Sequence, residues 1–101
     1  MTNRKFVPKN FNVDNEDEVK ALYQSLLDED VANSPEALRT WILKWSELGS
    51  VLSEVSCRRY VAMTCNTKDE AAAKAYEDFV SNIDPISNEY SDKLNKKLMS
   101  H

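Results

Sequence analysis

Glycine and proline are scarce in this sequence, with one glycine and three prolines among 101 residues. These residues supply the tight turns that join short strands, so their scarcity disfavours an all-β fold. A basic surface is also lacking, because 13 lysines and arginines against 17 aspartates and glutamates give a net charge of −4. We therefore expect no nucleic-acid partner. The lysines at 93, 96 and 97 are interpreted as a response to a helix dipole.

Long apolar runs are missing as well. No segment approaches the roughly 20 consecutive apolar residues that span a bilayer, so no membrane partner is expected. The first eight residues have basic side chains but no apolar run behind them, unlike a secretory signal. Cys57 and Cys65 would lie about 12 Å apart along one helix, whereas a disulfide needs Cα atoms within roughly 7 Å. Reduced thiols without an export signal predict a cytoplasmic protein.

The usual residues of a hydrolytic or redox enzyme are not found. The single histidine is the last residue, His101, and neither His-Glu-x-x-His, Cys-x-x-Cys nor a glycine-rich phosphate loop occurs. Cys57, Cys65 and His101 lack the spacing of a zinc site. Arg58 and Arg59 can bind a carboxylate, but helix surfaces carry such pairs routinely. We therefore assign no catalytic, cofactor-binding or metal-binding residue, and we expect no enzyme activity from this chain alone.

What the sequence does contain is two long apolar stripes at steps of three and four residues, the spacing of one helix face. The first stripe is Leu38, Trp41, Trp45, Leu48, Leu52 and Val55. The second is Tyr76, Phe79, Ile83, Ile86, Tyr90, Leu94 and Leu98. Because a short link at residues 63–69 joins them, we predict an antiparallel helical hairpin. Trp41 and Trp45 are interpreted as core residues.

Local signals place the helix ends within a single all-α domain over residues 1–101. Asn15 and Glu18 resemble a capping box at the start of a shorter N-terminal helix, which should fray near Val31. Ser-Pro-Glu at 34–36 opens a second helix that is expected to reach Asn66. A capping box at residues 67–70 opens the third. Phe6 and Phe11 are expected to hold an extended arm, residues 1–12, against the helices.

Two residues interrupt these helices in the sequence. The stripe stays in phase across Gly49, which predicts a continuous helix. The glycine is either simply tolerated there or marks the close approach of a neighbouring backbone, and we favour the second interpretation. Pro85 lies inside the second stripe and removes one helix hydrogen bond. The stripe resumes in register, so a kinked helix is preferred over two separate helices.

A further apolar strip follows Val55 on another face of the same helix: Cys57, Val61 and Cys65. A helix that is apolar on two sides needs two partners. The hairpin supplies one of them. The second is either the N-terminal helix or a part of the protein that this sequence does not contain.

Several short segments resemble the N-terminal helical region of oligoendopeptidase F, a zinc metallopeptidase related to thimet oligopeptidase. They are Trp-Ser-Glu-Leu at 45–48, Arg-Tyr-Val-Ala-Met-Thr-Cys-Asn-Thr at 59–67, Asp69, Ala-Tyr at 75–76, Phe-Val at 79–80 and Ile-Asp-Pro at 83–85. Upstream, Phe-Val-Pro at 6–8, Phe11 and Leu-Leu at 26–27 are similar as well. The resemblance thus covers nearly the whole chain, and residues 63–69 are its most distinctive part.

The resemblance implies an elongated, all-helical peptidase with a deep channel and a catalytic zinc. Its zinc ligands and catalytic glutamate lie far downstream and have no counterpart here, so zinc is expected only in a catalytic domain outside this segment. The chain would then be a non-catalytic N-terminal domain that forms part of the channel wall and admits short peptides. Its partners would be those peptides and the downstream catalytic domain.

A stand-alone helical interaction module is the alternative. Its hairpin would bind a partner helix through Cys57, Val61 and Cys65, although this does not account for the distinctive segment at 63–69. A purely structural spacer is a third interpretation. An uncovered apolar strip predicts weak self-association of the isolated chain.

Overall fold

The computed structural model describes residues 6–31, 34–65 and 69–100, and every regular element in these ranges is a helix. The elements are α1 (Glu16–Asp28), α2 (Pro35–Cys65), α3 (Glu70–Asp78), the π-helical segment η1 (Phe79–Ile83) and α4 (Asp84–Met99). The predicted all-α class is confirmed. The predicted link between the second and third helices falls partly on residues 66–68, outside the described residues.

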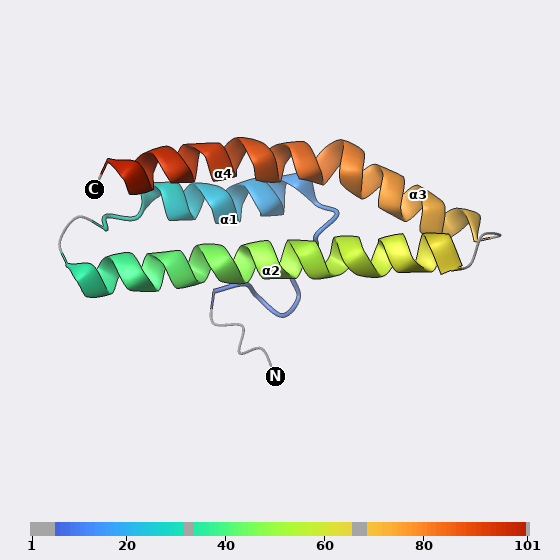
Figure 1. The fold of residues 1–101 in the computed structure, drawn as a ribbon, viewed down its shortest axis with the longest axis horizontal. Helices are drawn as coiled ribbons and strands as arrows, with labels where there is room; N and C mark the ends of the chain where they lie inside the picture. Colours follow the sequence, from blue (N-terminus) through green and yellow to red (C-terminus); the bar gives the residue numbers. More distant parts are fainter. Residues whose placement is uncertain (1–5, 32–33, 66–68, 101) are drawn as a thin grey trace.

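The shorter helix α1 lies between the two long arms of the fold (Figure 1). α2 runs antiparallel to both α1 and α4, while α3 packs directly against the C-terminal part of α2 (Figure 1). The result is an elongated body of 53 × 28 × 20 Å. The long helices therefore cover each other directly at the α3 end and largely through α1 over the rest of their length.

Both predicted stripes face the core. On α2, Trp41, Leu48 and Leu52 are buried, and the other stripe residues are partly buried against them. Four residues of the second stripe are also buried: Phe79, Ile83, Ile86 and Leu94. α1 contributes Val19, Tyr23 and Leu26, which fill the space between α2 and α4. One continuous apolar core thus joins α1, α2, η1 and α4, whereas α3 contributes no buried residue to it.

The helix starts follow the predicted side-chain caps with two differences. The Asn15 side chain accepts hydrogen bonds from the backbone N–H groups of Asp17 and Glu18, but the Asn15 N–H donates to the Asn12 carbonyl rather than to a capping-box glutamate. Ser34 Oγ accepts from the Ala37 N–H at 3.0 Å, as predicted.

The third helix is capped by Asp69, whose carboxylate accepts from the Ala72 N–H at 3.1 Å. The predicted capping box placed this cap at residue 67, which lies outside the described residues, so the helix begins two residues later than expected. At the other end of α1, the helix stops at Asp28, and Val31 beyond it is buried.

The N-terminal arm is held to α2 by more than the two predicted phenylalanines. Phe6 and Phe11 are partly buried against the core, but Val7 is almost completely buried. The backbone N–H groups of Phe6 and Val7 both donate to one carboxylate oxygen of Glu47 on α2. The arm therefore lies against α2 on the side away from α1, and the chain then continues into α1 (Figure 1).

Gly49 lies inside a continuous helix, as predicted, but the favoured explanation, a close approach of a neighbouring backbone, was wrong. A Cβ atom built at this position would meet no atom within 4 Å outside the local helix backbone. No neighbouring backbone approaches, and Gly49 instead borders two surface hollows.

We expect the Gly49→Ala variant to be more stable than the wild-type chain by up to about 1 kcal/mol, because glycine is the costlier residue in a helix interior and the site has room for a methyl group. Urea denaturation followed by circular dichroism measures this gain. Ser50→Ala on the exposed side of α2 is the matched control, with an expected gain of about half that size. A loss of stability in Gly49→Ala would show that the position requires glycine.

Pro85 neither splits the helix nor leaves it regular. α3, η1 and α4 form one continuous helical path that bends between α3 and α4 (Figure 1). In the wider π-helical turn, the Asp84 N–H donates to the Phe79 carbonyl five residues earlier. This widening accommodates a proline because it relieves the contact between the ring and the carbonyl one turn before it. The bent helix that the stripe predicted is therefore observed, with a π-helical turn as its cause.

Candidate functional site

A cleft of about 410 Å³ opens between α2 and the α3–α4 helix. From α2 it is lined by small or aromatic residues, among them Trp45, Gly49, Ser53, Ser56 and Tyr60. The facing wall consists of Tyr76, Phe79, Asp84, Ser87 and Ser91. Sequence reasoning did not identify this cleft. The only sequence signals for it are Gly49, Pro85 and the serines spaced three or four residues apart on each helix.

The base of the cleft is a fixed polar contact. The hydroxyl of Tyr23 and Ser87 Oγ are 2.9 Å apart, and the Tyr23 ring stacks on Tyr90 with centroids 5.4 Å apart. Burial raises the pKa of the Tyr23 hydroxyl, the hydrogen bond with Ser87 opposes that rise, and the negative charge of Asp84 adds to it. Tyr23 is therefore neutral at physiological pH and acts as a hydrogen-bonding group.

The mouth of the cleft is aromatic. The Tyr60 and Tyr76 rings meet edge to face with centroids 5.5 Å apart, and half of the Tyr60 surface is exposed. Trp45 is only partly buried on the same side of α2. The contact between Tyr60 and Tyr76 joins α2 to α3.

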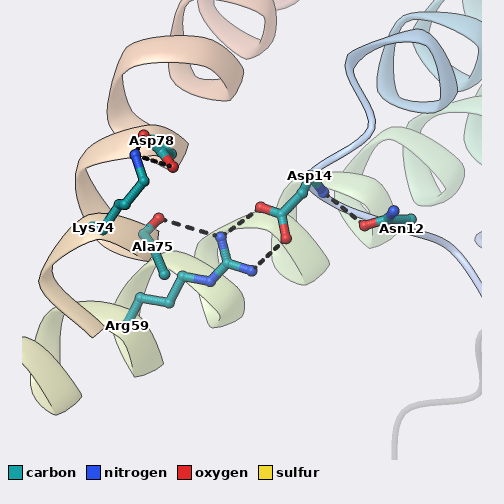
Figure 2. Close-up of polar contacts among 6 residues, drawn as sticks. All are labelled: Asn12, Asp14, Arg59, Lys74, Ala75 and Asp78. Atoms are coloured by element: carbon teal, nitrogen blue, oxygen red, sulfur yellow. Dashed lines mark hydrogen bonds and ion pairs between the residues drawn. The ribbon is translucent and has the colours of Figure 1, made fainter. Parts of the chain in front are cut away.

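Close to the cleft, Arg59 ties three segments together (Figure 2). Its guanidinium donates to both carboxylate oxygens of Asp14, at 2.7 and 2.9 Å, and to the carbonyl of Ala75 on α3 at 3.4 Å. It also lies 5.9 Å from the centre of the Phe79 ring. The expected carboxylate partner of this arginine is thus within the chain, while Arg58 pairs with Glu54 along α2 at 2.5 Å.

Arg59 and Asp14 each shift the pKa of the other. Hydrogen bonds from Arg59 lower the pKa of Asp14, and those to Asp14 raise the pKa of Arg59. An aspartate whose pKa is lower in the folded chain stabilises it above the pKa of the unfolded chain, and that contribution is lost as the pH falls through the folded pKa. The pair therefore fixes the start of α1 to α2 and α3 at neutral pH.

The strip of Cys57, Val61 and Cys65 is not covered by the N-terminal helix. Both cysteines are free and exposed, and Val61 retains 49% of its surface. The suggestion that α1 covers this strip is wrong, because α1 packs between α2 and α4 instead. Of the alternatives raised from the sequence, a partner outside the described residues remains.

Among the described residues, no group of three or more histidine, cysteine, aspartate or glutamate side chains is arranged to hold a metal ion. A helix long and apolar enough to cross a membrane is likewise not found in the described part of the chain. The donor set present here does not fit a zinc centre, so no chemical step of peptide hydrolysis is derived from these residues.

The described part of the chain is thus an elongated, all-α helical domain. The family model for the Peptidase M3 N-terminal domain matches residues 6–101, and the chain belongs to this family. The resemblance to the N-terminal region of an M3-family peptidase is therefore confirmed, and it implies a peptidase parent. No curated protein and no solved structure gives a significant match.

Proposed function

We propose that this chain is the non-catalytic N-terminal domain of a zinc-dependent oligopeptidase and forms part of the wall of its substrate channel. The observation that supports this most strongly is the family match over residues 6–101. The zinc ion would be held by a downstream catalytic domain, as in the oligoendopeptidase F group that the sequence resembles. The substrates would be short peptides, and a cytoplasmic location goes with this proposal because both thiols are free.

The shape and surface of the domain support a wall rather than a catalytic role. A rod 53 Å long can border a channel over much of its length. The strip of Cys57, Val61 and Cys65 remains exposed on α2, which suits a surface that faces another domain or the channel. A narrow channel lined in this way would admit short peptides and exclude folded proteins.

The test uses the intact gene product that carries this sequence. We expect it to cleave short peptides, to lose activity with a chelator and to regain it with Zn²⁺. Val61→Arg in the exposed strip should change the ratio of kcat/KM between short and long peptides. Ala62→Arg, exposed one residue further along α2, is the matched control and should leave this ratio unchanged.

Two outcomes would contradict the proposal separately. Activity that persists after chelation would exclude zinc dependence. An unchanged length preference in Val61→Arg, together with an unchanged preference after deletion of residues 1–101, would exclude the channel-wall role.

The exposed strip also favours a second candidate, a stand-alone helical module that binds a partner helix. In this case the 101-residue chain should bind its partner without any peptidase domain. Sedimentation at increasing concentration tests the related expectation of weak self-association. A chain that stays monomeric at millimolar concentration would show that this strip does not drive association.

A further inference from the structure

Asp84 is the only charged residue among those that line the cleft between α2 and α4. Its side chain is half-buried, and within the described residues it has neither an ion pair nor a hydrogen bond through its carboxylate. A partly buried carboxylate is stabilised by a cationic or hydrogen-bonding partner. Among the described residues that line it, the cleft therefore has one negative charge and no positive one.

The backbone places this carboxylate by means of the π-helical turn. Because the Asp84 N–H bonds to the Phe79 carbonyl, the turn contains one residue more than a regular α-helical turn. One extra residue rotates the following helix face by about 100° at 3.6 residues per turn. The turn thereby sets the orientation of the α4 face that carries Asp84, Ser87 and Ser91, which share this face by ordinary helical spacing and line the cleft. π-Helical turns inside α-helices occur frequently at functional sites.

The other lining groups suit an organic cation that has a charged N–H head and an apolar stem. Serine hydroxyls on both walls can accept hydrogen bonds from N–H donors. Aromatic surface lies at two places along the cleft: at Tyr60 and Tyr76, and at Trp45, about 22 Å away along α2 at 1.5 Å per residue. Such surface attracts cations and packs against an apolar stem. The volume of about 410 Å³ lies within the roughly 300–1,000 Å³ typical of small-molecule sites. An anion would meet a carboxylate and no cationic lining residue, and a metal ion would find a single charged ligand.

We propose that this cleft binds an alkylguanidinium or alkylammonium group, with Asp84 as its counter-ion, neighbouring serine hydroxyls as hydrogen-bond acceptors and part of the aromatic lining against its stem. Such a group belongs to an arginine or lysine side chain, either of a peptide ligand or of another segment of the same polypeptide. The inference does not rest on the proposed peptidase function, since it follows from the cleft alone.

The first test titrates the 101-residue chain with Nα-acetyl-arginine methylamide, followed by amide chemical shifts around residues 45–60 and 84–91. Nα-acetyl-citrulline methylamide has nearly the same shape without the charge. We expect the arginine derivative to bind at least about tenfold more tightly, because a hydrogen-bonded charged partner contributes at least that factor. Equal affinities, or no saturable binding of the arginine derivative, would overturn the proposal.

Variants then test the role of Asp84 itself. Asp84→Asn should weaken binding of the arginine derivative by at least about tenfold. Asp92→Asn on the same helix is the matched control, because Asp92 is exposed, pairs with Lys96 at 3.7 Å and lies outside the cleft. Unchanged affinity in Asp84→Asn, with the fold retained by circular dichroism, would overturn the assignment of the counter-ion.

The cation could come from a peptide ligand or from another segment of the same polypeptide. The same titration on the intact gene product distinguishes these two sources. Retained binding indicates an external peptide side chain. Lost binding together with a lower melting temperature in Asp84→Asn indicates a side chain of the same polypeptide. Lost binding without any effect of Asp84→Asn on the melting temperature would overturn the proposal for the intact protein.

Discussion

The Trp41→Ala variant is expected to lose about 3–5 kcal/mol of stability, the usual cost of removing a large buried aromatic side chain. Trp41 has no exposed surface and packs on Trp45 with ring centroids 5.7 Å apart. Its indole N–H also donates to the Leu26 carbonyl near the end of α1 at 2.7 Å. The truncation removes packing and a polar contact at the point where α1 meets α2. Urea denaturation followed by circular dichroism at 222 nm measures the loss.

Trp41→Phe keeps this prediction measurable if the alanine variant does not fold, since small domains are stabilised by only about 5–15 kcal/mol. Phenylalanine retains much of the ring volume but not the indole N–H. The Leu26 carbonyl still accepts the Glu29 N–H at 3.3 Å, so it is not left without a partner. We expect a loss of about 1–2 kcal/mol. Losses below about 1 kcal/mol in both variants would contradict the central position of Trp41.

The helices themselves were predictable because their signals are local. Apolar residues three or four apart define a face, and a serine or asparagine before that face satisfies free N–H groups, whatever the rest of the chain does. Trp41 and Phe79 were therefore assigned to the core correctly from sequence. The family resemblance also predicted the class of the parent protein, which the spacing of apolar residues alone does not reveal.

The arrangement of the helices was less predictable, since it depends on contacts between distant residues. Two helices with apolar stripes of similar length are expected to pair directly. Instead, α1 lies between α2 and α4, because its apolar residues contact both of these helices. Gly49 was misinterpreted for the same reason. A glycine indicates that a side chain is missing, but not whether a neighbour or an open cleft occupies that space.

The cleft was the hardest feature to predict. Asp84, Ser87 and Ser91 look like ordinary polar residues of an exposed helix face, and the π-helical turn sets where that face lies relative to Tyr76 and Phe79. The proline that accompanies this turn was visible in the sequence. Its effect on register was not, because a kink, a break and a widened turn all fit the same stripe.

The Lys97→Met variant is expected to lose about 1–3 kcal/mol of stability, because hydrogen bonds from a charged group to backbone carbonyls are costly to remove. α1 ends in Asp28 and has no basic residue in its last turn, so its own sequence does not balance the helix dipole. Lys97 of α4 supplies the missing charge. Its ammonium donates to the carbonyls of Leu27, at 2.6 Å, and Glu29. Urea denaturation measures the loss.

The expected loss of stability comes from the contacts of Lys97 and not from the removal of a positive charge as such. Lys96 is the matched control: it is exposed and lies 3.7 Å from Asp92 along its own helix. Lys96→Met removes the same charge, and we expect a change of at most about 0.5 kcal/mol. Because methionine keeps an apolar stem near Trp41, any excess loss in Lys97→Met reports the contacts of the ammonium group. Faster hydrogen exchange at Glu29, whose N–H bonds to Leu26, should accompany it. Equal losses in the two variants would show that α1 ends without help from α4.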